Sequence, residues 1–191
     1  EAAGVQGIQI EDQEMPKKCG HTPNRRVVPL ADMLKRIEVA VESRRCADCL
    51  IIARTDARTS LGLDEAIARG RAFAKAGADI VFVESPESED EFRRVGAELA
   101  GEAWLIANMV PSGRSPELSA DQLKAMGFVA AIWPSVGMAA ACAALESAYS
   151  HLAAKGISQG QPMATWSMAQ LHDLVGFPDV WDFERRHVEA P

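Results

Sequence analysis

A cysteine among cationic side chains is the most reactive element of the sequence. The run Lys17-Lys18-Cys19-Gly20-His21 places two amines before the thiol and an imidazole shortly after it. Neighbouring positive charges stabilise a thiolate. A cysteine in such surroundings can give or take a proton near neutral pH, which makes Cys19 a candidate general acid or base.

The segment that carries this cysteine is an unusually long connection. It runs over 14–28, follows a short apolar strand pattern, and is rich in positive charge. Loops of this length inside a compact domain are usually functional lids. We therefore expect 14–28 to cover a site.

Short apolar segments alternate with helical patterns along the chain. Three of them begin with a helix-ending glycine, at Gly4, Gly77 and Gly127, and two more cover 49–54 and 103–108. The intervening stretches have the apolar spacing of amphipathic helices, over 30–44, 63–76, 87–99, 119–126 and 136–155. Strands that are apolar on both faces and alternate with helices indicate a parallel α/β sheet covered on both sides.

Polar residues end the predicted strands. They are Glu11 and Asp12, Arg54, Glu84, Asn108, and Pro134 with Ser135. In a closed (β/α)₈ TIM-type barrel these ends form the catalytic face, whereas a doubly wound sheet gathers only the ends beside its switch point. A single acid there is often a helix cap or a loop residue. Two acids, a guanidinium and an amide at successive ends favour a barrel with a site.

Composition excludes several classes of function. The chain of 191 residues is 48% hydrophobic and 25% charged, as in a globular protein. A net charge of −7 and a pI near 5.1 argue against nucleic acid as a partner, so an anionic substrate would need a local basic pocket. Neither a G-x-G-x-x-G nor a Walker pattern occurs, which argues against nucleotide binding. No apolar run approaches the length of a membrane span.

The cysteines suggest a reducing compartment. Four of them are too few and too scattered for a disulfide framework, and the Cys46–Cys49 pair has no second pair with which to hold zinc. The cytoplasm is the expected location.

Several motifs of the sequence resemble those of a known family. Residues 11–13 (Glu-Asp-Gln) followed by 17–21 are similar to the signature of the isocitrate lyase and methylisocitrate lyase group, within the isocitrate lyase and phosphoenolpyruvate mutase superfamily. The similarity continues through 53–57 (Ala-Arg-Thr-Asp-Ala), 84–86 (Glu-Ser-Pro) and 107–110 (Ala-Asn-Met-Val). It extends over essentially the whole chain.

The resemblance has consequences for architecture. Five strand-helix units are three fewer than the eight of a barrel, so we expect residues 1–155 to supply strands four to eight. The resemblance implies a homotetramer in which a C-terminal helical tail, 156–191, is exchanged between subunits. It also implies a Mg²⁺ cofactor, with Mn²⁺ as the alternative.

The resemblance assigns catalytic roles to the cysteine loop. Cys19 would be the general acid that protonates the carbanion left by bond cleavage, and His21 would orient or tune it. Lys17 and Lys18 complete the predicted catalytic set.

The strand ends would bind the substrate and the metal. Arg54 would hold one carboxylate in a bidentate manner, and Asn108 would donate to a second. Glu84 would fix Arg54 or a metal-bound water, and Glu11 would hold the metal through water, with the main aspartate ligands expected upstream of this chain. Gly20 and Pro134 complete the predicted substrate-binding set.

The activity implied is Mg²⁺-dependent cleavage of a small 2-hydroxy di- or tricarboxylate to a 2-keto acid and a carboxylate. Met109 and Val110 follow Asn108 where methylisocitrate lyases carry hydroxyl residues, which favours an alkylmalate or oxaloacetate-cleaving type. Three alternatives stay open. They are an oxaloacetate hydrolase or decarboxylase, a carboxyphosphonoenolpyruvate-type phosphonomutase, and an inactive barrel relative.

Overall fold

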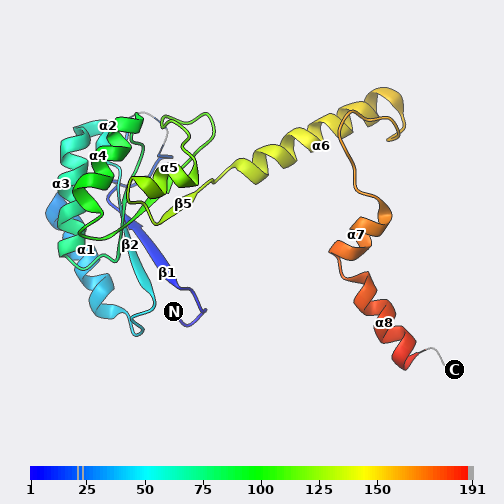
Figure 1. Cartoon of the computed structure of the whole chain (residues 1–191), viewed down its shortest axis with the longest axis horizontal. Coiled ribbons are helices and arrows are strands. Elements are labelled where there is room, and N and C mark those ends of the chain that lie inside the picture. Colours follow the sequence, from blue (N-terminus) through cyan, green and yellow to red (C-terminus); the bar gives the residue numbers. More distant parts are fainter. Residues whose placement is uncertain (21, 23, 189–191) are drawn as a thin grey trace. The chain divides into compact units, whose positions relative to one another are not determined.

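The computed structural model describes residues 1–20, 22 and 24–188 (Figure 1). His21, a predicted catalytic residue, lies outside the described residues. The chain divides into two compact units, Glu1–Val136 and Gly137–Pro191. The first unit contains the sheet, and the second consists of helices.

The first unit is built on one parallel sheet whose five strands lie in the order of the sequence. They are β1 (Gly7–Glu11), β2 (Leu50–Thr55), β3 (Ile80–Val83), β4 (Trp104–Asn108) and β5 (Ala130–Ile132). A doubly wound sheet reverses its strand order at a switch point, and this sheet does not. The order is that of successive barrel strands, which confirms the predicted partial barrel. Among the described residues β1 does not pair with β5, so these strands do not close a ring.

Helices connect the strands and cover the sheet. They are α1 (Leu30–Ser43), α2 (Ala57–Leu61), α3 (Leu63–Lys75), α4 (Glu89–Leu99) and α5 (Ala120–Ala125). In Figure 1 helices α1 to α4 lie together along one side of the strands. All of them except the short α2 coincide with stretches predicted from the apolar spacing.

The core lies between this helical layer and the sheet. Met33 and Ile37 of α1, Phe73 of α3, Phe92 of α4 and Leu105 of β4 are each at most 1% exposed. Burying an aliphatic or aromatic side chain of this size contributes roughly 1.5–3 kcal/mol. This packing fixes the strands, and with them the residues at the strand ends.

Close packing at Gly96 of α4 leads to a prediction about stability. A Cβ added at Gly96 would overlap the carbonyl oxygen of Met126, a backbone atom that cannot move alone. We expect Gly96→Ala to lower the free energy of unfolding by about 1–3 kcal/mol, because overpacking a tight contact forces backbone shifts. Gly101→Ala is the matched control, since a Cβ there meets nothing within 4 Å. Equal denaturant midpoints for the two variants would contradict this packing.

The second unit is helical, with α6 (Val136–Lys155), α7 (Met168–Leu174) and α8 (Phe177–His187). α7 and α8 fall inside the predicted tail, and they meet through ring contacts of His172 with Phe177 and Trp181. None of the three helices has a buried residue. No helix among the described residues combines the length and the apolar character that a membrane crossing needs.

Candidate active site

The predicted polar strand ends form one cluster at the carboxyl edge of the sheet. Glu11 pairs in register with Arg54 across β1 and β2, Glu84 directly follows β3, and Asn108 ends β4. Arg54 lies at the centre: its Nε is 3.8 Å from Glu11 Oε2, and its Nη1 is 3.7 Å from Glu84 Oε2. Asn108 Nδ2 donates to both oxygens of Glu84 at 3.3 Å. The structure therefore brings together four of the predicted site residues.

A carboxylate that the sequence reading did not single out holds Arg54 in place. Asp56, fully buried, accepts from Arg54 Nε on Oδ2 and from Nη2 on Oδ1, each at 2.9 Å. Burial lowers the pKa of Arg54, but the hydrogen bonds to Asp56 and the charges of Glu84, Asp56 and Glu11 outweigh it and raise the pKa above its ordinary value. Arg54 is thus a fixed cation whose Nη1 edge is free of the Asp56 fork.

Below Asp56 lies a second buried network, which joins β1, β2 and α3. Asp12 accepts from the Asp56 backbone N–H at 2.9 Å, from Thr55 Oγ1 at 2.7 Å, and from Arg69 Nη1 at 3.0 Å. Burial raises the pKa of Asp12, against the hydrogen bonds from Asp56, Thr55 and Arg69 that lower it. Every one of these contacts faces the scaffold, so Asp12 supports the site rather than taking part in it.

The cysteine loop lies on the strand ends. Lys17 Nζ is 3.0 Å from Glu11 Oε1, and Ser85 Oγ donates to the Gly20 carbonyl oxygen at 3.0 Å. Gly20 is buried, and a Cβ added there would lie 2.6 Å from Arg54 Nη2. The predicted residues Lys17 and Gly20 are therefore part of the cluster.

Other predicted residues lie outside this cluster. Lys18 Nζ donates to the Asn24 carbonyl oxygen within the loop, at 3.2 Å. Pro134 is exposed in the turn after β5, and Cys19 is exposed next to the buried Gly20. Met109 is buried in the core, where its sulfur accepts from the Leu118 N–H. Met109 therefore does not line the site, and it gives no support to the preference for an alkylmalate or oxaloacetate-cleaving type.

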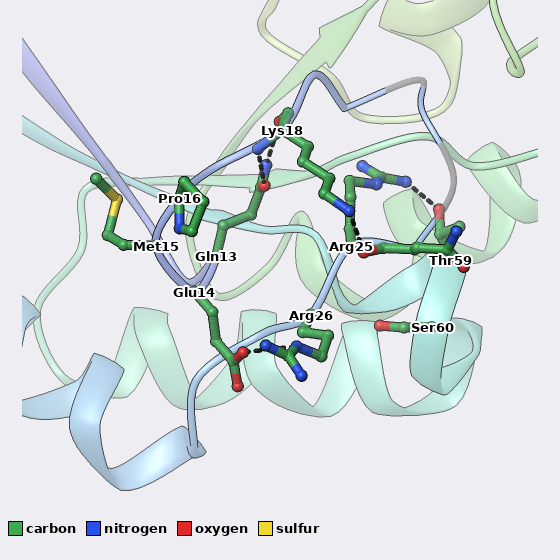
Figure 2. Close-up of a pocket in the computed structure, with 10 residues that line it drawn as sticks. Gln13, Glu14, Met15, Pro16, Lys18, Arg25, Arg26, Thr59 and Ser60 are labelled. Carbon is green, nitrogen blue, oxygen red and sulfur yellow. Dashed lines mark hydrogen bonds and ion pairs between the residues drawn. The ribbon is translucent and has the colours of Figure 1, made fainter.

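A cavity of about 680 Å³ lies beside the loop (Figure 2), and Glu11, Arg54, Glu84 and Asn108 are not among the described residues that line it. Its lining comes from the loop and from α2: Gln13, Glu14, Met15, Pro16, Lys18, Asn24, Arg25, Arg26, Thr59 and Ser60. Figure 2 shows the loop held to itself by the Glu14–Arg26 ion pair and by Gln13, and held to α2 by Arg25 donating to Thr59. The loop is thus bonded to α2 across the edge of a cavity, and the space between the loop and α2 is not filled by side chains.

The described residues do not by themselves make a metal site. Among them no group of three or more His, Cys, Asp or Glu side chains is arranged to hold an ion. The site does offer oxygen atoms to a ligand, because Asn108 Oδ1 is buried without a hydrogen-bond partner. Glu11 is a single carboxylate at the edge of the cluster, so these residues can contribute to a metal site only in part.

Comparisons with known proteins point to one family. The sequence model of phosphoenolpyruvate phosphomutase matches residues 1–153. The chain is similar to the 2,3-dimethylmalate lyase of Eubacterium barkeri, with 40% identity over 187 residues that cover 98% of this chain and 64% of the relative. The chain spans less than two thirds of the length of the first curated relatives that it matches.

Solved structures agree with this result. Oxaloacetate acetylhydrolase in complex with the inhibitor 3,3-difluorooxalacetate matches with a TM-score of 0.84 and 34% identity, over 96% of this chain and 62% of that one. Phosphonopyruvate hydrolase in complex with oxalate and Mg²⁺ matches with a TM-score of 0.80 and 25% identity, over 98% and 65%.

Proposed function

Because this chain belongs to the phosphoenolpyruvate phosphomutase family, we propose that the whole protein is a Mg²⁺-dependent carbon–carbon lyase. It would cleave a small 2-hydroxy di- or tricarboxylate to a 2-keto acid and a carboxylate. The observation that carries the proposal is Arg54, a fixed cation at the strand ends, beneath the loop that carries Cys19. An alkylmalate of the 2,3-dimethylmalate type is the first candidate substrate, since a lyase of that name is 40% identical to this chain.

Arg54 and Asn108 would orient the two carboxylates of the substrate. Two nitrogens of Arg54 already bind Asp56, and a guanidinium has five N–H donors in a fixed fork. Its Nη1 edge remains for an incoming carboxylate, which a guanidinium binds with planar specificity. Asn108 lies on β4, and its Nδ2, which donates to Glu84 at a long 3.3 Å in this structure, would turn to the second carboxylate, so that a short dicarboxylate is held at both ends.

Cys19 would supply the proton that completes the reaction. The substrate hydroxyl gives its proton to a general base, its oxygen forms the keto group as the C2–C3 bond breaks, and the electrons of that bond remain on the departing carboxylate fragment as an enediolate. The thiol of Cys19 then gives its proton to that carbon, and the proposed role of His21 is to tune the transfer. The loop 14–28 excludes water while the carbanion exists.

The metal remains a proposal because the described residues fit it only in part. When bound, Mg²⁺, or Mn²⁺ in its place, would offset the charge that develops on the keto-acid oxygens. Glu11 would hold the ion through a water molecule, and the remaining ligands would come from parts of the whole protein outside this chain. The likeness to phosphonopyruvate hydrolase, which was solved in complex with oxalate and Mg²⁺, supports Mg²⁺ as the cofactor.

A coupled assay for keto-acid release tests the activity. The full-length protein with Mg²⁺ is offered isocitrate, methylisocitrate, 2,3-dimethylmalate and oxaloacetate, with and without a chelator. We expect chelator-sensitive release from one of the hydroxy acids. No release from any of them would contradict the lyase and favour an inactive relative.

A second candidate is hydrolysis or decarboxylation of oxaloacetate. The likeness to oxaloacetate acetylhydrolase, at 34% identity, favours it over the phosphonomutase, whose reaction would appear in phosphorus NMR. Oxalate formed from oxaloacetate would identify a hydrolase, and pyruvate would identify a decarboxylase.

We also propose that the protein is a homotetramer in which the tail 156–191 is exchanged between subunits. The support is that α8 exposes Phe177, Trp181 and Phe183, large apolar groups that typically mark an interface. We expect Trp181→Asp to shift the full-length protein towards smaller species in sedimentation velocity, by loss of buried aromatic area. Asp173→Asn, on α7, is the control. An unchanged sedimentation coefficient for Trp181→Asp would count against the exchange.

A further inference from the structure

One loop residue outside the predicted catalytic set is tied directly to the site. We propose that Arg25 is a positioning residue that couples docking of the loop 14–28 to the availability of Arg54, through the carboxylate of Asp56 that both arginines share. The inference rests on the proposed function, in which Arg54 binds a carboxylate of the substrate.

The carboxylates of Asp56, Glu84 and Glu11 surround Arg54. Asp56 binds it at two points at 2.9 Å, and Glu84 and Glu11 lie 3.7 and 3.8 Å from its nitrogens. A cation that is neutralised by carboxylates in a poorly solvated place attracts a further anion weakly. If Arg54 is to bind a substrate carboxylate, other cations must neutralise part of the negative charge of these carboxylates.

The loop supplies those cations. Arg25 Nη1 donates to Asp56 Oδ1 at 2.6 Å, and Lys17 Nζ lies 3.0 Å from Glu11 Oε1. With the loop docked, Asp56 and Glu11 are each shared with a second positive group. With the loop lifted, the same carboxylates would act on Arg54 alone. Docking therefore raises the positive potential that a substrate carboxylate meets, and by linkage an anion bound at Arg54 favours docking.

Arg25 contributes more to this coupling than Lys17. The side chains of Arg25 and Asp56 have no exposed surface, whereas 59% of the Lys17 side chain is exposed. Exposed ion pairs contribute little to stability. Loss of one partner of a buried pair is strongly destabilising, because the other charge stays buried without a partner. Arg25 also donates to Thr59 on α2, across the edge of the cavity that the loop bridges (Figure 2).

Limited proteolysis of the full-length protein tests the coupling without depending on activity. Trypsin cleavage after Lys18 is followed by mass spectrometry in the presence of Mg²⁺, with and without oxalate as the simplest dicarboxylate dianion. Arg26→Gln is the matched control, because the Arg26 side chain is 79% exposed and its ion pair among the described residues is with Glu14 of the same loop. Each variant removes one neighbouring tryptic site.

We expect Arg25→Gln to be cleaved after Lys18 about tenfold faster than Arg26→Gln, since cleavage follows the population of the lifted loop. Oxalate should slow cleavage in the wild type and in Arg26→Gln, and should have little effect in Arg25→Gln. Arg25→Lys should recover part of the protection because an ammonium can still reach Asp56. If Arg25→Gln does not fold, Thr59→Val, which removes only the second bond of Arg25, should shift cleavage in the same direction by a smaller factor.

Equal cleavage rates and equal oxalate protection in Arg25→Gln and Arg26→Gln would overturn the coupling. The steady-state counterpart is a KM that rises roughly tenfold in Arg25→Gln while kcat changes less, with both constants unchanged in Arg26→Gln. Failure of the proposed function gives a different result: the wild type would release no keto acid from any hydroxy acid, while the proteolytic difference between the variants would persist.

Discussion

Replacing Cys19 by serine is expected to lower kcat for hydroxy-acid cleavage by roughly 100- to 10,000-fold, the usual contribution of a positioned general acid. A serine hydroxyl is a much weaker acid than a thiol, so it cannot give its proton to the departing carbon at a comparable rate. KM should change little, because Cys19 is exposed on the loop and forms no part of the Arg54 cluster. Steady-state kinetics of the full-length variant provide the measurement.

The control for this variant is another exposed cysteine. Cys46→Ser makes the same chemical change at a residue that precedes β2 at the opposite end of the strand from Arg54. We expect it to retain the wild-type rate. A Cys19→Ser enzyme within a few-fold of wild type would remove Cys19 from the mechanism and leave the proton donor to be found elsewhere.

Replacing Arg54 by lysine is expected to lower kcat/KM by roughly 100- to 1,000-fold, or about 3–4 kcal/mol of transition-state stabilisation. An ammonium retains the charge but cannot bind Asp56 at two points and also present a planar edge to a carboxylate. Asp56 is fully buried, so the loss of its bidentate partner should also lower the thermal midpoint.

Arg58→Lys is the matched control for Arg54→Lys. Arg58 lies four residues further along, on α2, and among the described residues it pairs with Glu91 and Glu87 rather than with the carboxylates around Arg54. It should lose some stability and keep kcat/KM near the wild-type value. A kcat/KM for Arg54→Lys within threefold of wild type would contradict the role of Arg54 as the carboxylate anchor.

The sequence was sufficient to predict the elements and the edge at which polar groups gather. Apolar strands and amphipathic helices have different periods, and each predicted strand end could be read from the residue that follows the apolar run. Glu11, Arg54, Glu84 and Asn108 lie together because ends of neighbouring parallel strands are adjacent, which requires no knowledge of side-chain packing.

The buried ion pairs that support the site could not be predicted from the apolar pattern of the sequence. Arg25 meets Asp56 across 31 residues, and Arg69 meets Asp12 across 57, so neither pair leaves a local signature. Asp56 stands at the start of α2, where aspartate is ordinarily a helix cap. Its side chain makes no cap hydrogen bond and binds the arginines instead.

The use of Met109 as an indicator of substrate type is not supported, for a reason that the period of a strand could have shown. Successive side chains of an extended chain point to opposite faces. Asn108 points to the site, so the next residue, Met109, points into the core. Substrate preference must therefore be sought in residues other than Met109.

Proton NMR of the full-length enzyme in D₂O, with Mg²⁺ and 2,3-dimethylmalate, tests the central claim most directly. Cleavage of the C2–C3 bond followed by proton delivery from an exchangeable thiol predicts equal amounts of pyruvate and propionate, with a single deuterium at the propionate carbon that carried the broken bond. If the spectrum shows no cleavage products from this substrate or from the other hydroxy acids, the protein is not the lyase proposed.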